Sequence, residues 1–315
     1  MKNVIDILDL SVKEIDSLMD TAEDMAKHPE KYEDALRHRT LATLFFEPST
    51  RTRLSFESAM LSLGGNVIGF SDAGTSSTTK GETLADTVKV VSGYADIIAM
   101  RHPMEGATAV ACEHARIPVI NAGDGGHNHP TQTLIDLLTI RQRKGHLDHL
   151  TVGFCGDLKF GRTVHSLVNS LVRYPGNEFY FISPEELRIP QYLKDETLTP
   201  LHQTYKETAD LEAELPGLDV LYMTRIQQER FFNEEEYLRL KGCYQLDEAM
   251  LKLAPPDMPV LHPLPRIDEI KLDVDNDPRA AYFDQVHNGV YIRMAIILAL
   301  LGIPDPLTGK KVLQR

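Results

Sequence analysis

The chain has 315 residues, a formal net charge of −13, 42% hydrophobic residues and 25% charged residues. This length predicts two domains, and the composition is typical of a soluble globular protein. The acidic balance argues against a nucleic-acid surface, and no apolar run approaches the roughly 20 residues that span a bilayer. Because the N-terminal residues lack the apolar core of a signal peptide, we expect a cytoplasmic protein with no membrane partner.

Cysteines are few and scattered along the chain. Cys112, Cys155 and Cys243 form no Cys-x-x-Cys pair and no zinc spacing. We therefore expect three reduced core residues, with neither a disulfide framework nor a metal site built on them.

Apolar runs alternate with helical patterns from the N-terminus onward. A first helix is predicted over 9–27, with Ser11 and Glu14 as its capping box. The first half then predicts strands at 41–46, 66–70, 96–101 and 118–121, and helices at 52–63, 82–94, 105–114 and 130–143. The second half predicts strands at 150–156, 178–182, 219–224 and 259–262, and helices at 162–173 and 290–301. Residues 71–82 are a long polar loop with no predicted structure of its own, and such loops often act as lids.

This alternation predicts an α/β fold of two domains, each a parallel β-sheet flanked by helices. We expect the first domain to cover 1–147 and the second to cover 148–286, joined near 143–150. The C-terminal helical segment, 287–315, is expected to pack back on the first domain.

The segment Ser49-Thr50-Arg51-Thr52-Arg53 combines hydroxyl and guanidinium donors directly before a helical pattern. At the start of a helix, free backbone N–H groups and the helix dipole attract anions. An ordinary N-cap is the simpler interpretation, but a cap needs neither a second threonine nor two arginines. The segment therefore predicts a phosphate site.

Polar residues also follow other predicted strands, and ligands of open parallel sheets bind at those carboxyl ends. They are Arg101, His129-Pro130-Thr131-Gln132, Gly161-Arg162-Thr163, Thr224-Arg225-Ile226-Gln227 and His262-Pro263-Leu264-Pro265-Arg266. Cations and neutral donors dominate, and neither a carboxylate pair nor a nucleophile with an evident base stands out. The pattern indicates chemistry by positioning and charge stabilisation on an anion.

Several of these segments admit rival interpretations. Residues 156–163 nearly match the nucleotide-binding phosphate loop, but arginine replaces its lysine and the loop interior is bulky, which favours an arginine aimed at a carboxylate. A metal set of Asp124, His127 and His129 is less favoured than a neutral histidine that donates a hydrogen bond, so we expect no metal and no cofactor.

Four further charged residues have both a structural and a catalytic interpretation. Asp157, Asp268 and Glu269 are candidate acid–base carboxylates, although caps or ion-pair partners are their simpler role. Lys80, in the polar loop, is either a solvated lysine or an active group.

The motifs at 49–53, 129–132 and 262–266, in this order and spacing, resemble those of the transcarbamoylases. The resemblance runs from Phe45 to Arg293. Within this family the chain is similar to the enzymes that act on aspartate, because of residues 80–83, 161–165, 222–227 and 262–265. The Ser-Met-Gly loop and the His-Cys-Leu-Pro stretch of the ornithine enzymes are absent.

The resemblance implies carbamoyl transfer from carbamoyl phosphate to L-aspartate, the committed step of pyrimidine synthesis. It implies two sets of binding residues. Those for carbamoyl phosphate are Ser49, Thr50, Arg51, Thr52, Arg101, His129, Gln132, Leu264 and Pro265, and those for aspartate are Lys80, Arg162, Arg225 and Gln227. The groups implied to act in catalysis are Arg51, Thr52, Lys80, Arg101 and His129. Arg53 is the member of its segment most expected to make structural contacts instead.

The resemblance also implies a homotrimer with shared active sites, into which Ser76 and Lys80 reach from a neighbouring subunit. A zinc-bearing regulatory chain that assembles such trimers into a dodecamer is a further possible partner, and Glu105 is a weak candidate for its contact. Two alternatives stay open: a transcarbamoylase for another amino acid or a carbamoylated analogue, and a non-catalytic scaffold subunit. The scaffold is disfavoured because every expected site position is filled.

Overall fold

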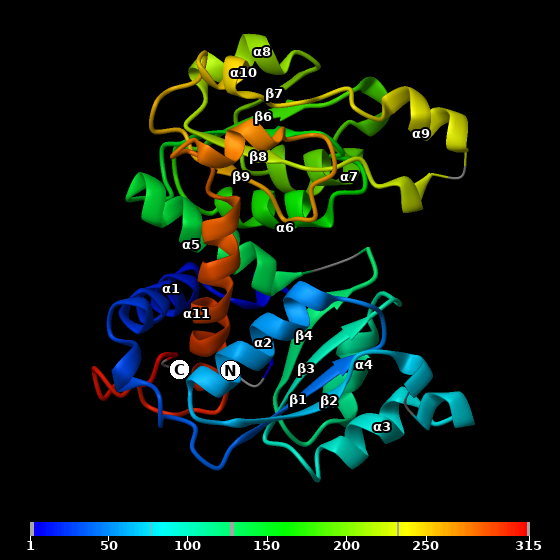
Figure 1. The fold of residues 1–315 in the computed structure, drawn as a ribbon, viewed down its shortest axis with the longest axis vertical. Helices are drawn as coiled ribbons and strands as arrows, with labels where there is room; N and C mark the ends of the chain where they lie inside the picture. Colours follow the sequence, from blue (N-terminus) through cyan, green and yellow to red (C-terminus); the bar gives the residue numbers. More distant parts are fainter. Residues whose placement is uncertain (1–2, 76, 127–128, 232, 314–315) are drawn as a thin grey trace. The chain divides into compact units, whose positions relative to one another are not determined.

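The structure, a computed structural model, describes residues 3–75, 77–126, 129–231 and 233–313. It consists of two compact units: unit 1 is Met1–Ile135 with Val286–Arg315, and unit 2 is Asp136–Gln285 (Figure 1). Both divisions fall inside helices, α5 (Pro130–Lys144) and α11 (Tyr282–Leu300), so each of these helices contributes residues to both units. Within the described ranges, no helix has the length and apolar character that a membrane crossing needs.

Unit 1 is built on a four-stranded parallel sheet in the order β2-β1-β3-β4. Its strands are β1 (Thr40–Phe45), β2 (Asn66–Phe70), β3 (Ile97–His102) and β4 (Val119–Asp124). Its other helices are α1 (Val12–Lys27), α2 (Thr50–Ser62), α3 (Leu84–Val91) and α4 (Ala107–His114). The predicted capping box of α1 is confirmed, since Ser11 and Glu14 cap each other's backbone N–H.

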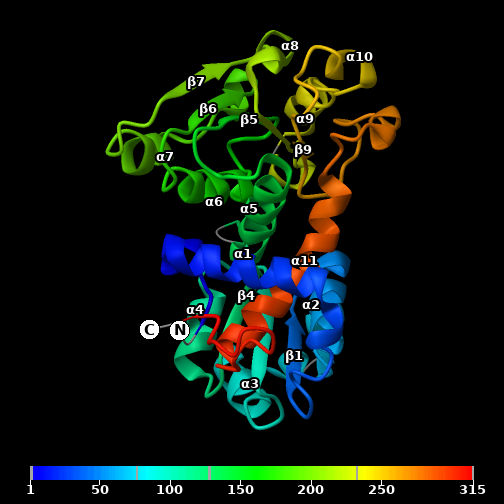
Figure 2. The same cartoon turned by 90° about the vertical axis from the view of Figure 1, so that its left-hand side faces the viewer.

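Helices cover both faces of this sheet, because the strands are apolar on both sides. On one face Ala42 and Leu44 of β1 pack with Val88 of α3 and Ala111 of α4. The opposite face carries α2 and α11 (Figure 2). The predicted packing of the C-terminal helix on the first domain is confirmed: Arg293 of α11 donates to Ser55 Oγ of α2 at 2.9 Å.

Unit 2 is built on a five-stranded parallel sheet in the order β7-β6-β5-β8-β9. Its strands are β5 (Thr151–Cys155), β6 (Glu178–Ile182), β7 (Tyr205–Thr208), β8 (Val220–Met223) and β9 (Val260–Leu261). Its helices include α6 (Arg162–Leu171), α7 (Gln191–Leu193), α8 (Leu211–Glu214), α9 (Glu234–Leu240) and α10 (Glu248–Leu251). One side of its core is aromatic: the rings of Phe154 and Phe181 are stacked, with their centroids 5.9 Å apart.

The two-domain α/β prediction is therefore confirmed, with three local corrections. The edge strand β7 was not predicted, because its sequence, Tyr-Lys-Glu-Thr, lacks an apolar run. Helix α11 begins eight residues before the predicted start at 290, with a polar segment at its beginning. The polar loop at 71–82 does have structure, since it forms the short 3₁₀ helices η3 (Ala73–Thr75) and η4 (Ser77–Lys80).

Candidate active site

The predicted phosphate segment lies where β1 ends and α2 begins. Ser49 occupies the N-cap position of α2, but its side chain makes no capping hydrogen bond. The ordinary N-cap interpretation is therefore wrong for this residue. Arg51 is exposed and Thr52 is buried, so the first turn of α2 presents a cation to solvent above a shielded hydroxyl. This arrangement suits an anion at the helix N-terminus.

Arg53, in the same turn, makes a structural contact, as predicted. Its Nε donates to Glu57 Oε1 at 2.7 Å, one helical turn further on. Glu57 Oε1 also accepts from Thr43 Oγ1 of β1 at 3.2 Å. Arg53 thus helps to join α2 to the sheet, which separates it from the ligand candidates of the segment.

Arg101 lies near the end of β3, paired with Phe45 of β1. Its Nε donates to Glu47 Oε1 at 2.6 Å, and its side chain is only 15% exposed. Phe46 N donates to Arg101 O at 2.9 Å, which fixes the strand backbone beside it. The carboxylate therefore holds one edge of a largely buried guanidinium, and β1 and β3 set its place next to the phosphate segment.

His129 and Gln132 come at the start of α5. His129 is buried, and its Nδ1 lies 3.3 Å from Thr131 Oγ1. Gln132 N donates to His129 O at 2.9 Å, so one helical turn holds both residues. In unit 1 the phosphate segment follows β1, Arg101 lies near the end of β3 and His129 follows β4, so all three belong to the carboxyl edge of one parallel sheet.

Asp124, at the end of β4, organises the turn that precedes this helix. Its carboxylate accepts from Gly106 N at 3.1 Å, from Thr108 Oγ1 at 3.2 Å and from Asn121 Nδ2 at 3.0 Å. His127 lies outside the described residues. Over the described ranges, no group of three His, Cys, Asp or Glu side chains is placed to hold a metal. The hydrogen bonds of Asp124 give it a structural role.

Lys80 is the last residue of η4 and is exposed. Ser76, the other polar-loop residue predicted to reach a neighbouring subunit, lies outside the described residues. Thr83 follows Lys80 and caps α3 by accepting from Asp86 N at 3.1 Å. The loop therefore ends at a well-defined helix start that carries Lys80 just before it.

In unit 2, Asp157 organises the segment that resembles a nucleotide-binding loop. Phe160 N donates to Asp157 Oδ1 at 2.9 Å, and Asp157 N donates to Thr224 Oγ1 at 2.9 Å. Burial raises the pKa of this carboxyl, although hydrogen bonds from the loop favour its charged form. A carboxylate at the centre of the loop would repel a bound phosphate, so the nucleotide-loop alternative finds no support here. Asp157 therefore makes structural contacts within the loop, but it does not cap α6, whose N-cap residue is Gly161.

The arginines predicted to bind aspartate lie at two neighbouring strand ends of unit 2. Arg162 is the first residue of α6, and Arg225 and Gln227 follow β8, which pairs with β5. Asp157 Oδ2 accepts from both the backbone N and the side-chain Nε2 of Gln227, each at 3.4 Å. The buried carboxylate thus connects the segment before Arg162 to the segment that carries Arg225.

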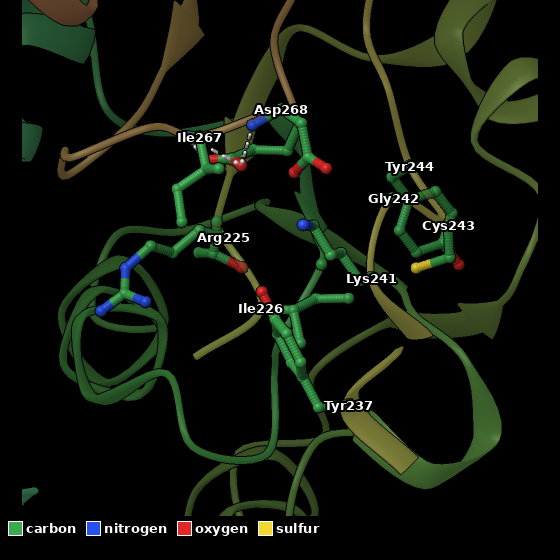
Figure 3. Close-up of a pocket in the computed structure, with 12 residues that line it drawn as sticks. Arg225, Ile226, Tyr237, Lys241, Gly242, Cys243, Tyr244, Ile267 and Asp268 are labelled. Atoms are coloured by element: carbon green, nitrogen blue, oxygen red, sulfur yellow. Dashed lines mark hydrogen bonds between the residues drawn. The ribbon is translucent and has the colours of Figure 1, made fainter. Parts of the chain in front are cut away.

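A pocket of unit 2 adjoins Arg225. Its lining includes Arg225, Ile226, Tyr237, Lys241, Cys243, Tyr244 and Asp268. Figure 3 shows Lys241, Cys243 and Tyr244 on one side of it, with the guanidinium of Arg225 extending away from them. Cys243 is exposed by its accessible surface, so the prediction of three core cysteines is wrong for this residue.

Leu264 and Pro265 lie in the loop that follows β9. Leu264 N donates to His262 Nδ1 at 2.8 Å, and His262 Nε2 lies 2.7 Å from Glu269 Oε1. Arg266 pairs with Asp275, with Nη2 donating to Oδ2 at 2.6 Å. The predicted structural role of Glu269 is confirmed, because its carboxylate is taken up by contacts within the loop.

Sequence reasoning missed the residues that hold the predicted ligands in place. Glu47 follows the phosphate-site strand by two residues, yet nothing in a single sequence pairs it with Arg101. His262 was noted only as part of a motif, and its contact with Glu269 is visible only in the folded loop. The spacing of seven residues between them falls on a loop, where no periodicity predicts which side chains meet.

Comparisons with known proteins agree with this architecture. Residues 2–142 match the family model described as the carbamoyl-P binding domain of aspartate/ornithine carbamoyltransferase, and residues 148–300 match its Asp/Orn binding domain. The chain is 60% identical over 303 residues to the aspartate carbamoyltransferase catalytic subunit of Lachnoclostridium phytofermentans, covering 96% of this chain and 99% of that one. It is 57% identical to the protein of the same name from Clostridium acetobutylicum, covering 96% and 98%.

Solved structures give the same result. The catalytic subunit of M. jannaschii aspartate transcarbamoylase superposes with a TM-score of 0.89 at 46% identity, covering 96% of this chain and 99% of that one. Aspartate transcarbamoylase from Trypanosoma cruzi, in complex with carbamoyl phosphate and aspartate, superposes with a TM-score of 0.88 at 39% identity, covering 94% and 95%. The two domain models together, and each of these relatives alone, cover nearly the whole chain. The chain therefore belongs to the aspartate/ornithine carbamoyltransferase family.

Proposed function

We propose that the chain is an aspartate carbamoyltransferase, which converts carbamoyl phosphate and L-aspartate into N-carbamoyl-L-aspartate and phosphate, the committed step of pyrimidine synthesis. The observation that carries the proposal is the pair of arginines in unit 2, Arg162 and Arg225. A dicarboxylate suits two guanidinium groups, because each can bind one carboxylate through two parallel hydrogen bonds. The side-chain cation of ornithine would instead be repelled by Arg225.

Carbamoyl phosphate is assigned mainly to unit 1. The first turn of α2 supplies Ser49, Thr50, Arg51 and Thr52 as phosphate donors. Arg101 bridges a phosphate oxygen and the carbonyl oxygen, and Glu47 restrains it at 2.6 Å. This assignment is supported by the exposed cation and uncapped N-terminus of α2, both of which favour an anion.

The reaction builds negative charge on the carbonyl oxygen when the aspartate amine attacks the carbonyl carbon. Thr52, Arg101 and His129 are proposed to stabilise that oxygen, and loss of one such donor typically costs about 100–1000-fold in rate. The bond from carbon to the phosphate oxygen then breaks, and the departing phosphate takes the amine proton. A phosphate that accepts this proton explains why no side-chain base is needed.

The carbamoyl amino group carries two N–H donors that need acceptors. Gln132 and the backbone carbonyls of Leu264 and Pro265 are proposed to accept from it. Aspartate is assigned to Arg162, Arg225 and Gln227, with Lys80 as an additional cation. Gln227 is supported in this role by Asp157, which accepts from both its backbone and its side chain.

The larger assembly is part of the same proposal. We assign carbamoyl phosphate binding to a domain of residues 1–147 with 287–315, and aspartate binding to residues 148–286. Lys80 is proposed to act in the site of a neighbouring subunit, in a homotrimer that we place in the cytoplasm. A zinc-bearing regulatory chain would be an additional partner that assembles such trimers into a dodecamer, and the mass of the complex purified from its own cells distinguishes a bare trimer from a dodecamer.

The test is carbamoyl transfer by the purified chain with either L-aspartate or L-ornithine as acceptor. Product with aspartate and none with ornithine is expected. Transfer to ornithine alone would overturn the substrate assignment. If neither acceptor reacts, calorimetry with N-phosphonacetyl-L-aspartate tests the scaffold alternative: absence of binding by a chain that circular dichroism shows to be folded would favour a non-catalytic subunit.

A further inference from the structure

Leu264 has a backbone conformation that a leucine rarely adopts. Its φ angle is +56°, in the left-handed region, where the Cβ atom crowds the following carbonyl oxygen. The residue is also followed by proline, which further restricts its backbone. Such a conformation persists only where the surrounding structure holds it, and it is a frequent feature of functional sites.

The side chain of His262 holds this backbone. Leu264 N donates to His262 Nδ1 at 2.8 Å, so Nδ1 is an acceptor and carries no proton. In a neutral imidazole the proton is then on Nε2, which donates to Glu269 Oε1 at 2.7 Å. The hydrogen bond to Leu264 therefore requires one defined tautomer of His262.

Glu269 selects that tautomer and closes the loop on itself. Its carboxylate accepts from Ile267 N at 3.2 Å and from Asp268 N at 3.2 Å, in addition to His262 Nε2. His262 is 1% exposed and Glu269 is 5% exposed, so water does not compete for these contacts. Ionised Glu269 can only accept hydrogen bonds, and it therefore requires a donor on Nε2.

The backbone of His262 is itself anchored. His262 N donates to Gln285 Oε1 at 2.8 Å, and Gln285 Nε2 donates to Asp136 Oδ1 at 2.7 Å. Tyr222 OH donates to the second oxygen of Asp136 at 2.9 Å. This chain of buried contacts ties the backbone of His262 to β8, so the imidazole extends from an anchored position.

We propose that His262 and Glu269 are positioning residues, which hold Leu264 in its left-handed conformation and so aim the carbonyl oxygens of Leu264 and Pro265 at the carbamoyl amino group. The inference rests on the proposed function, which assigns those two carbonyls to that group. A direct acid–base role does not fit His262, because both of its ring nitrogens are engaged and its side chain is buried.

Two substitutions separate the two nitrogens of the imidazole. In His262→Asn the side-chain oxygen lies near the position of Nδ1 and can accept from the N–H two residues on, as asparagine commonly does in turns. In His262→Gln the amide nitrogen lies near the position of Nε2 and can still donate to Glu269, but no acceptor remains for Leu264 N. The first variant keeps the contact to Leu264, and the second keeps the contact to Glu269.

The readout is binding of phosphonoacetamide, which carries an amide on a stable phosphonate, compared with inorganic phosphate, which has no amide. We expect His262→Asn to bind phosphonoacetamide within about threefold of wild type, and His262→Gln to bind it about tenfold more weakly, the value of one hydrogen bond. Both variants should bind inorganic phosphate as wild type does. Equal losses in the two variants, a larger loss in His262→Asn, or a parallel loss of phosphate binding would overturn the proposal.

Glu269→Gln tests the tautomer. A glutamine has one acceptor oxygen, so its amide nitrogen must face either His262 or the N–H groups of Ile267 and Asp268, and phosphonoacetamide binding should again fall about tenfold. The ¹⁵N chemical shifts of His262 in the wild-type enzyme, assigned by their disappearance in His262→Asn, should report a proton on Nε2. A proton on Nδ1 would refute the pairing even if a variant failed to fold.

The inference and the proposed function fail in different ways. Absence of carbamoyl transfer to aspartate by the wild-type chain would overturn the function. An active wild type whose two His262 variants bind phosphonoacetamide equally would overturn only the positioning role.

Discussion

The phosphate segment of unit 1 and the loop after β9 in unit 2 present polar groups by opposite means. The segment at 49–53 lies at the start of a regular helix, where the first backbone N–H groups have no acceptor within the helix and neighbouring residues add side-chain donors. The loop at 262–269 is proposed to use backbone carbonyls, and a buried histidine and glutamate hold the backbone N–H of Leu264 beside them. One site is made by local sequence, and the other depends on contacts that form only when the loop folds.

This difference predicts how each region responds to mutation. At the start of α2, the proposed ligand Arg51 and the structural residue Arg53 lie two positions apart, so the loss of activity should differ sharply between substitutions of the two. In the loop, the residues proposed to contact substrate do so through their backbones, so function should depend on side chains that never touch substrate. Four substitutions, from the largest expected effect to the smallest, test this contrast.

Arg51→Ala should cause the largest loss. It removes the guanidinium proposed to hold the phosphate, and we expect kcat/KM for carbamoyl phosphate to fall about 1000-fold, as for loss of a charged donor at a reacting anion. Arg53→Ala is the matched control two residues along the same helix: it removes only the 2.7 Å contact to Glu57, and its kcat/KM should change less than fivefold. Similar losses in both variants would contradict the separation of roles within α2.

Arg225→Ala should raise the KM for aspartate about 100-fold, because a carboxylate loses two charge-assisted hydrogen bonds. Binding of carbamoyl phosphate, measured without aspartate, should stay within about threefold of wild type. Arg239→Ala is the control in the same unit. The Arg239 side chain is 63% exposed and pairs with Glu186 at the surface. A rise in KM for both variants, or a loss of carbamoyl phosphate binding in Arg225→Ala alone, would place Arg225 outside aspartate recognition.

Glu47→Gln should have an intermediate effect. The amide still reaches Arg101, but it lacks the charge that restrains the guanidinium at 2.6 Å, and we expect kcat to fall about tenfold. Glu57→Gln, which changes the carboxylate partner of Arg53, should alter kcat less than threefold. Steady-state rates with both substrates saturating measure the two values, and equal rates would show that Arg101 needs no partner to act.

Much of the fold followed from the sequence, because its strands are short apolar runs between helical patterns. β2 and β6 begin and end at the predicted residues. β7 was not predicted because this edge strand has few apolar positions. The first eight residues of α11 were not predicted because that part of the helix is polar. Both misses have the same cause: tertiary packing stabilises an element whose own sequence carries little hydrophobic pattern.

The candidate binding residues could also be predicted from the sequence, for a related reason. Arg51, Arg101 and Arg225 each lie at or beside a strand end, where topology alone predicts a site. The contacts of Glu47, His262 and Glu269 were not predicted, because hydrogen bonds between loop residues produce no periodic pattern in the sequence. The left-handed conformation of Leu264 was also invisible, since leucine gives no sign of a positive φ angle.

The smallest predicted effect concerns stability and pH. Burial lowers the pKa of the His262 imidazole, and this outweighs the opposing effects of the hydrogen bond that it donates to Glu269 and of that carboxylate's charge. The positive charges of Arg266 and Arg225 also lower this pKa. The folded pKa is thus below the unfolded value of about 6.5, so the unfolded chain binds the proton first. The stability contributed by neutral His262 is present above about pH 6.5 and is lost as the pH falls through the folded pKa.

The urea midpoint of unfolding, measured from pH 8 to pH 5, checks this prediction. Wild type should lose stability on acidification more steeply than His262→Asn, by at most about 1.4 kcal/mol per pH unit for one proton. Burial also lowers the pKa of His102 and His165, but these histidines titrate in both proteins, so their contributions cancel in the difference. Parallel pH profiles would mean that His262 takes up a proton without disturbing Leu264, in which case the loop at 262–269 keeps its shape by other contacts and the contrast with the helix start disappears.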